Sequence, residues 1–254
     1  MTPQNLTSEI LSDKEIRRYT LQISIPELGL SGQEKIKQSK VLVIGAGGKG
    51  TSVLQNLAAV GIGKLGISDN YIVNENELSR QYLYGNSDLG KQKAIVSKQK
   101  LVDINHYVNY ELHNVCLNKV NILKICNKYD ILIDATDNFP AHYLINDAAV
   151  ELGIPMIYGD VSDSAGIISV FNYNDGPSFR CLFPEAQNKN KTSKHLGFAC
   201  QVTLMSIIGS IMANETLKVI LDIENTLNGK LLKFDMINYS FRSSIIKKNP
   251  DNFK

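Results

Sequence analysis

The sequence lacks several features that would assign it to a specialised class of protein. Its four cysteines include no C-x-x-C pair, which argues against a cysteine-rich metal site. The 27 Lys and Arg residues nearly balance the 25 Asp and Glu residues, and no block of like charge occurs. General nucleic-acid binding is therefore not indicated. The first twenty residues contain no apolar core of the signal-peptide type, so we expect a cytoplasmic protein with reduced thiols.

Uninterrupted apolar stretches of membrane-spanning length are also missing. The most apolar helical candidate covers residues 199–221, and it contains Gln201, Asn214, Glu215 and Lys218. It falls short of the roughly 18 apolar residues in a row that a spanning helix requires. We therefore expect a helix in the core or at a protein interface, and no membrane partner.

The residues that are present alternate between strand-like and helix-like segments through the first two-thirds of the chain. The strand candidates are continuous apolar runs, which is typical of parallel strands buried on both faces. We predict strands at residues 40–46, 64–69, 107–114, 130–136 and 155–161. Helices are predicted between them, at residues 51–62, 90–104 and 139–152. The pattern predicts an α/β fold with a Rossmann-like parallel sheet.

The pattern changes in the C-terminal third. An apolar run at 166–173 is followed by a polar segment at 185–195, which predicts a surface loop, and then by the long apolar helix. Residues 229–247 alternate like a β-hairpin. We expect the sheet to continue here in mixed or antiparallel form. No internal repeat or long linker divides the chain, so residues 1–254 are predicted to form one domain.

A glycine-rich turn follows the first predicted strand. Gly45, Gly47, Gly48 and Gly50 belong to a G-x-G-G-x-G sequence between a strand and a helix, and Asp69 ends the next strand. Glycines let the backbone approach phosphate oxygens, and the start of a helix directs N–H groups and partial positive charge at them. Asp69 can accept hydrogen bonds from ribose hydroxyls. This predicts nucleotide binding, and by itself it fits NAD as readily as ATP.

The residues downstream favour ATP. The polar connection after Asp69 holds Arg80, Lys91 and Lys93, and several cations suit a triphosphate better than a dinucleotide. The segment DATDN follows the fourth strand and places Asp134 and Asp137 at the carboxyl edge of the sheet, where ligands bind in open α/β folds. A carboxylate there is a natural magnesium ligand.

Taken together, these motifs resemble the MoeB/ThiF/HesA family, the bacterial relatives of ubiquitin-activating enzymes. The resemblance covers residues 14–250 and is carried by RRYTLQISIPELGLSGQEKIKQSKVLVIGAGGKG, ELSRQYLY, GKQKA, IDATDN and GKLLKFDMINYSFR. Within it, residues 14–160 would form the nucleotide-binding part. Residues 161–250 would supply a crossover loop, the long helix and the last strands.

The resemblance implies an adenylyltransferase that uses ATP and Mg²⁺. Its substrate would be the C-terminal carboxylate of a small ubiquitin-like sulfur carrier protein, or of a peptide with a free C-terminus. The turn at Gly45–Gly50 would hold the phosphates and Asp69 the ribose. Arg80 and Lys93 would bind the triphosphate, Asp137 would bind magnesium, and these three would be the catalytic residues. A homodimer with the long helix near its interface is expected, without nucleic acid.

Four positions in the motifs of the predicted nucleotide site depart from the family pattern. The arginine that reaches a partner's ATP in the family is Leu21 here, with Arg17 and Arg18 nearby. The family's asparagine before L-x-R-Q is Glu77, and the second acid of its D-x-D is Tyr71. A carboxylate at position 77 would repel the triphosphate unless it turns away or binds metal. Lys49 stands where an apolar residue is usual, and either a phosphate contact or a solvent-facing lysine would explain it.

The cysteines depart as well. Many relatives hold a structural zinc with two C-x-x-C pairs, of which the first would fall at Ser178 and Cys181 and the second would follow KKNPDNFK. One thiolate does not build a tetrahedral site, so no zinc is expected and Cys181 is predicted to be a small buried hydrophobic residue. The crossover segment KTSKHLG has no family-type cysteine. Cys200 lies just beyond it, at the expected start of the helix.

Two other hypotheses stay open at the level of sequence. A nucleotide-binding or scaffold protein that lost turnover is favoured by Leu21 and Glu77 and opposed by Arg80, Lys93 and Asp137. An NAD-dependent oxidoreductase would explain the glycine turn and Asp69, but it leaves the cations and DATDN without a role.

Overall fold

The five predicted parallel strands are present, each close to its predicted bounds. The computed structural model describes residues 7–162, 164–184 and 202–253. Its parallel strands are β1 (Lys40–Ile44), β2 (Lys64–Ser68), β3 (Asn109–His113), β4 (Ile131–Asp134) and β5 (Met156–Ser162). Strand β1 pairs with β2 on one side and with β4 on the other, so the strand order reverses at β1. Such a reversal of strand order is where open α/β sheets bind ligands.

The sheet continues in antiparallel form, as the C-terminal pattern predicts. Strands β6 (Ala165–Phe171), β7 (Lys230–Asp235) and β8 (Ser240–Ile245) follow β5 as antiparallel neighbours. Within the described residues the strands form an eight-stranded sheet in the order β3-β2-β1-β4-β5-β6-β7-β8. The predicted fold class, a Rossmann-like parallel sheet with an antiparallel extension, is confirmed.

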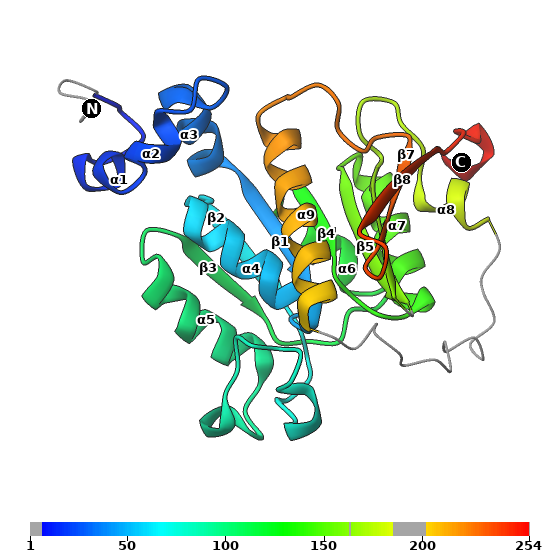
Figure 1. The fold of residues 1–254 in the computed structure, drawn as a ribbon, viewed down its shortest axis with the longest axis horizontal. Coiled ribbons are helices and arrows are strands. Elements are labelled where there is room, and N and C mark those ends of the chain that lie inside the picture. Colours follow the sequence, from blue (N-terminus) through cyan, green and yellow to red (C-terminus); the bar gives the residue numbers. More distant parts are fainter. Residues whose placement is uncertain (1–6, 163, 185–201, 254) are drawn as a thin grey trace.

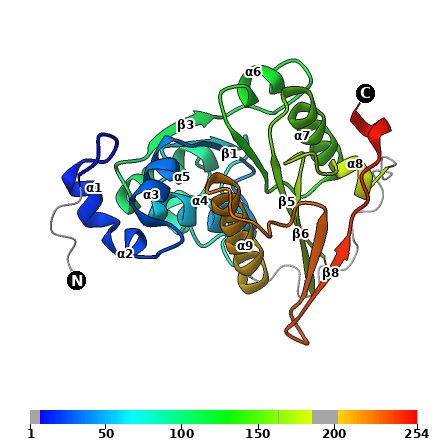
Figure 2. The same ribbon diagram turned by 90° about the horizontal axis from the view of Figure 1, so that it is seen from above.

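Helices cover both faces of the sheet (Figures 1 and 2). One face packs against α3 (Gly29–Gln38), α4 (Gly48–Val60), α5 (Lys93–Ile104) and α9 (Val202–Ile220). The other packs against α6 (Ile122–Cys126), α7 (Phe139–Leu152) and α8 (Phe179–Leu182). None of the described helices combines the length and apolar character needed to cross a membrane.

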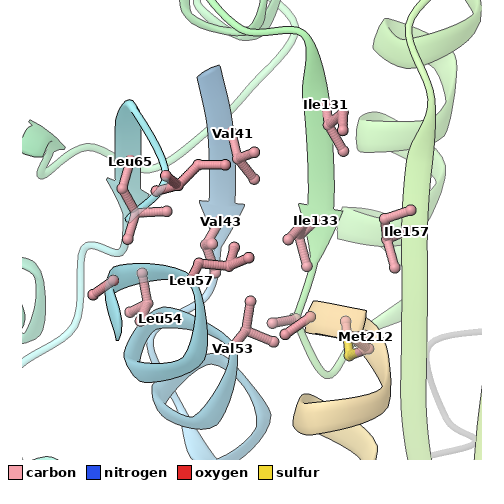
Figure 3. Close-up of a cluster of buried hydrophobic side chains, with 14 of the residues drawn as sticks. Val41, Val43, Val53, Leu54, Leu57, Leu65, Ile131, Ile133, Ile157 and Met212 are labelled. Atoms are coloured by element: carbon pink, nitrogen blue, oxygen red, sulfur yellow. The ribbon is translucent and has the colours of Figure 1, made fainter. Parts of the chain in front are cut away.

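Two hydrophobic cores explain why the strands are continuous apolar runs. Val41 and Val43 belong to the core that faces α4 and α9, and Figure 3 shows Val43 beside Leu57, with Met212 on α9 in the same cluster. The strand residues between them point toward α6 and α7 in the second core. Each fully buried aliphatic side chain contributes about 1.5–3 kcal/mol. The central strands are therefore apolar at consecutive positions.

The N-terminal segment forms helices that the sequence pattern did not predict. Helix α1 (Asp13–Arg18) begins with a capping box between Ser12 and Glu15, and α2 (Thr20–Ile23) follows it. These helices and α3 lie at the amino ends of the parallel strands, away from the connection after β2 (Figure 1). This placement puts the first helices at the opposite end of the sheet from the glycine turn.

Candidate nucleotide-binding site

The predicted site residues gather at the carboxyl edge of the parallel strands. The glycine turn follows β1, Asp69 follows β2, and Asp137 lies just after β4. The long connection from β2 to α5 lies at the same edge (Figure 1) and contains two short 3-10 helices, η1 (Glu75–Glu77) and η2 (Asn86–Asp88). The sheet therefore brings three separate motifs to one place.

The glycines of the turn have distinct structural tasks. Gly45 has φ of +96°, a conformation that L side chains rarely adopt. A Cβ at Gly50 would lie 1.9 Å from the carbonyl oxygen of Gly45, so only glycine allows this close crossing. Gly47 caps α4 without a side-chain hydrogen bond, and its nearest neighbour in the direction of a Cβ is Gln81 Nε2 at 3.7 Å. The backbone at Gly47 thus forms a cradle for an anion at the start of α4, whereas a Cβ at Gly48 would meet Met205 Sδ at 2.0 Å.

Asp69 connects the glycine turn to the end of β2 through hydrogen bonds. Its Oδ2 accepts a hydrogen bond from the Ala46 N–H at 2.7 Å, and its Oδ1 accepts one from the Tyr71 N–H at 2.8 Å. Burial raises the pKa of Asp69, and these two bonds only partly oppose that effect. Each carboxylate oxygen can accept a second hydrogen bond, so the side chain remains able to bind ribose hydroxyls.

Tyr84 contacts the glycine turn, and the sequence did not predict this contact. Its hydroxyl donates to the Ala46 carbonyl at 2.7 Å and lies 2.9 Å from Ser97 Oγ on α5. Burial raises the pKa of this phenol well above its usual value, so it stays a hydrogen-bond donor. The tyrosine stands beside the recognisable R-Q pair, yet nothing in its local sequence indicated a contact with a turn 38 residues earlier.

The two predicted triphosphate cations lie on either side of Glu77. Lys93 Nζ is 2.9 Å from Glu77 Oε2, and the Arg80 guanidinium is 3.6 Å from Glu77 Oε1. Gln81 Nε2 donates to the same Oε1 at 2.9 Å. Burial raises the pKa of Glu77, but the hydrogen bond and charge of Lys93 outweigh it and hold the pKa below its usual value. Glu77 therefore faces the two cations that are predicted to bind the triphosphate.

Lys91 does not belong to this cluster. Its ammonium lies 4.0 Å from Asp88 and is 57% exposed, whereas Lys93 is 5% exposed. Tyr71, at the position of the family's second acid, has an exposed side chain. The Lys93 ammonium lies 6.0 Å from the centre of the Tyr71 ring. Of the three cations in the connection, Arg80 and Lys93 are placed to meet a ligand.

The structure separates the two aspartates of DATDN. Asp134 is fully buried, where it accepts from Thr136 Oγ1 at 2.7 Å and lies 2.7 Å from His142 Nδ1. Burial raises its pKa, but the bonds from His142 and Thr136 bring it below its usual value. Asp137 is exposed, and its Oδ1 accepts a hydrogen bond from Asn138 Nδ2 at 3.4 Å. Asp137 is therefore available to a magnesium ion, while Asp134 and His142 hold the loop in position.

Lys49 is buried instead of facing solvent. Its side chain is 5% exposed, and its ammonium donates to the Thr136 carbonyl at 2.8 Å and to Asp160 at 3.1 Å. The interpretation as a solvent-facing lysine is wrong. The bonds join the start of α4, the loop after β4 and the strand β5. A buried cation thus stands beside the residue that precedes Asp137.

The arginines near Leu21 do not reach the site within one chain. Leu21 is 83% exposed, and α1, which carries Arg17 and Arg18, lies at the opposite end of the sheet (Figure 1). Arg18 donates to the carbonyl of Ile104, the last residue of α5. Arg17 and Arg18 therefore do not contact the glycine turn of their own chain.

Cys181 is a hydrogen-bonded thiol and not a buried hydrophobic residue. Its sulfur lies 3.6 Å from Ser178 Oγ and accepts from the Asn249 N–H at 3.3 Å and from Asn252 Nδ2 at 3.5 Å. Burial raises its pKa, but these bonds bring it below its usual value. No group of three potential metal ligands occurs among the described residues. Cys200 and the predicted loop at 185–195 lie outside them.

The arrangement fits a magnesium-bound nucleoside triphosphate. The start of α4 offers N–H groups, Asp69 offers carboxylate oxygens, and Asp137 offers a hard oxygen ligand. Lys93 and Arg80 supply positive charge at the same edge, although Glu77 now contacts both. An open hollow nearby is lined by Asn74, Glu75, Asn76, Glu77 and Arg80.

Comparison with known sequences identifies close relatives. The ThiF family model matches residues 19–253. A sulfur carrier protein adenylyltransferase of Thermus thermophilus is 39% identical over 242 residues, which cover 93% of this chain and 89% of that protein. The probable adenylyltransferase/sulfurtransferase MoeZ of Mycobacterium tuberculosis is 37% identical over 96% of this chain. The chain spans 63% of the length of MoeZ.

Solved structures share the fold at lower sequence identity. A crystal structure of PaaA superimposes with a TM-score of 0.81 and 24% identity, covering 98% of this chain and 79% of that one. A crystal structure of E. coli MccB with ATP gives a TM-score of 0.80 and 22% identity, covering 96% of this chain and 75% of that one. These similarities establish the architecture of the sheet and its helices.

Proposed function

The chain belongs to the ThiF family and is an adenylyltransferase; we propose that it transfers AMP from ATP to the C-terminal carboxylate of a small ubiquitin-like sulfur carrier protein. The observation that carries the proposal is the meeting of the glycine turn, Asp69, the Lys93 and Arg80 cations, and Asp137 at one sheet edge. The Thermus thermophilus relative, named for a sulfur carrier protein, supports the choice of acceptor. A peptide with a free C-terminus is the other acceptor of the same chemistry.

Each group has a role that follows from its chemistry. The start of α4 at Gly47 binds phosphate oxygens through N–H groups, and Asp69 accepts hydrogen bonds from the ribose. Lys93 and Arg80 neutralise the triphosphate. Asp137 would hold a magnesium ion, which would neutralise part of the phosphate charge.

The reaction is a displacement at the α-phosphorus. An oxygen of the acceptor carboxylate forms the new O–P bond, and the bond from the α-phosphorus to the bridging oxygen breaks. Pyrophosphate leaves with the bonding electron pair. The carboxylate needs no general base because it is already ionised, so the protein acts by positioning and by stabilising charge. Lys49, which donates to the carbonyl of Thr136, the residue before Asp137, is held in place by Asp160 on β5.

The chain is proposed to act as a homodimer, because Arg17 and Arg18 lie too far from the glycine turn of their own chain. It is also proposed to release or pass on the acyl-adenylate, because no family-type cysteine occurs in KTSKHLG. A second candidate function is a nucleotide-binding scaffold without turnover. The pairing of Glu77 with both triphosphate cations favours it. The NAD-dependent oxidoreductase hypothesis gains nothing from this geometry, because it gives those cations no role.

Exchange of labelled pyrophosphate into ATP tests the proposal. The wild-type protein is mixed with a carrier protein ending in Gly-Gly from the same genome, with MgATP and labelled pyrophosphate. We expect carrier-dependent exchange that falls about 10²–10³-fold in Asp137→Asn, the typical effect of losing one group that stabilises transition-state charge. Asp103→Asn, an exposed change on α5, serves as the matched control. Exchange unaltered by Asp137→Asn argues against this assignment, and binding of MgATP without exchange favours the scaffold.

A further inference from the structure

Glu77 occupies the place where the site should bind negative charge. Its two carboxylate oxygens face Lys93 at 2.9 Å, Arg80 at 3.6 Å and Gln81 at 2.9 Å. Charge-assisted hydrogen bonds from lysine to a phosphate oxygen have similar lengths. The carboxylate therefore accepts from Lys93 and Gln81 and lies beside the charge of Arg80, groups that a triphosphate would also need.

The neighbours of Glu77 are strongly desolvated. The Lys93 side chain is 5% exposed and the Glu77 side chain 19% exposed, so their attraction is weakly screened. An ammonium buried to this degree requires a partner. With Glu77 in contact, the partner is internal, and a phosphate that approaches the ammonium meets the negative charge of this carboxylate.

The contact with Glu77 leaves one polar atom of Gln81 without a hydrogen bond among the described residues. In Gln81, Nε2 points at Glu77, and Oε1 is buried without a hydrogen-bond partner in the part of the chain that the structure describes. An unsatisfied buried carbonyl costs about 1–3 kcal/mol. The same amide lies next to Gly47 in the phosphate cradle. Departure of Glu77 would free the amide to turn toward a ligand.

We propose that Glu77 is an internal substitute for a phosphate group, which holds Lys93 and Arg80 in position between turnovers and competes with the triphosphate for them. The inference rests on the proposed function only in assuming that these two cations bind the triphosphate. Its consequence is a weakened affinity for ATP and for pyrophosphate. Glu77 thus lowers the affinity of the site for polyphosphate. A protein with a neutral side chain at position 77 would bind polyphosphate more tightly.

The experiment is calorimetric titration of the full-length protein with two separate probes, MgATP and magnesium pyrophosphate. Glu77→Gln keeps the shape and removes the charge. We expect it to bind both probes about tenfold more tightly than the wild type, which corresponds to about 1.4 kcal/mol. Adding Lys93→Met to Glu77→Gln should abolish the gain.

Glu111→Gln is the matched control. Glu111 also bridges two cations, with Lys64 at 2.5 Å and Lys128 at 2.8 Å, and it lies on β3. The control changes the net charge equally and should alter neither affinity by more than about twofold, a small fraction of the 1.4 kcal/mol that a factor of ten represents. Thermal unfolding of each variant shows whether it is folded before titration.

Three results would overturn the inference. They are unchanged affinity in folded Glu77→Gln, weakened affinity in that variant, and failure of both proteins to bind either probe. The proposed function is judged separately. Tighter binding of pyrophosphate by Glu77→Gln without any carrier-dependent exchange would support the role of Glu77 and refute carrier adenylation.

Discussion

At the scale of single residues, the buried charges decide which side chains can act on a ligand. Sequence motifs placed Arg80, Lys93 and Asp137 at the sheet edge, and the structure places them there. The motifs gave no indication of Asp160 as the partner of Lys49, because a contact between residues 111 positions apart has no local signal. The sequence also did not predict that Glu77 contacts both Lys93 and Arg80, because the direction of a side chain in an irregular connection depends on tertiary packing.

The pair of Lys49 and Asp160 leads to an asymmetric prediction. Asp160→Asn should lower the free energy of unfolding more than Lys49→Met does. The first change leaves a 5% exposed ammonium without its carboxylate, whereas the second leaves a carboxylate that is 28% exposed and can be hydrated. Loss of the partner of a buried charge costs about 3–5 kcal/mol. Urea unfolding of both variants measures the difference, and an equal or smaller loss in Asp160→Asn contradicts the burial argument.

Asp69 gives a second prediction at this scale. Replacing it with Asn removes one acceptor from two backbone N–H groups that belong to the glycine turn and to Tyr71. We expect a loss of about 1–3 kcal/mol in the free energy of unfolding, the usual cost of an unsatisfied buried group. MgATP affinity should fall as well. Denaturant unfolding followed by calorimetry tests this, with Asp103→Asn as the exposed control.

At the scale of elements, apolar periodicity was informative for the parallel strands and for α7, whose bounds of residues 139–152 were predicted as observed. It missed α1 and α2, because they are short and bury only a few residues against the rest of the chain. Helix α4 begins at Gly48, inside the glycine motif and earlier than predicted. Sequence pattern does not reveal such starts, since glycine is a poor helix former that is used here for close approach.

The close approach of Gly50 to Gly45 in the glycine turn gives another prediction. In Gly50→Ala the new Cβ would lie 1.9 Å from the Gly45 carbonyl oxygen, so the turn must shift. We expect a loss of about 1–3 kcal/mol in stability, as for other overpacked sites, together with loss of nucleotide binding. Gly85→Ala is the matched control, because its Cβ would meet only an Asp88 oxygen at 4.0 Å. Thermal unfolding and MgATP titration of both variants compare them, and normal binding by Gly50→Ala would contradict the role of the turn.

Strand β3 provides a prediction for pH. Hydrogen bonds from Lys128 and Lys64 lower the pKa of Glu111 to about 2 from its ordinary value of 4.5. A carboxyl with a lowered pKa in the folded state stabilises the protein above its unfolded pKa and loses that contribution as the pH falls. The stability difference between wild type and Glu111→Gln should be constant near neutral pH and shrink from about pH 5 downward. Urea unfolding across this range tests the sign; a difference that grows on acidification contradicts it.

At the scale of the whole molecule, the antiparallel extension and the placement of α1 and α2 matter most. Because α1 lies across the sheet from its own glycine turn (Figure 1), we propose that Arg17 or Arg18 would reach a nucleotide only in a second copy of the chain. We predict a dimer with twice the chain mass of 28.2 kDa. Light scattering on a size-exclusion column measures this, and a monomer that still catalyses exchange would contradict the need for a second copy.

The glycine turn, Lys93 and Arg80 are proposed to bind ATP and not a dinucleotide. Calorimetric titration of the wild type with MgATP, and separately with NAD and NADH, tests this proposal most directly when Lys93→Met and Lys91→Met are measured beside it. We expect binding of MgATP that is lost in Lys93→Met and kept in Lys91→Met, because the Lys91 side chain is 57% exposed. A preference for NAD or NADH, or MgATP binding that is indifferent to Lys93, would contradict the proposal.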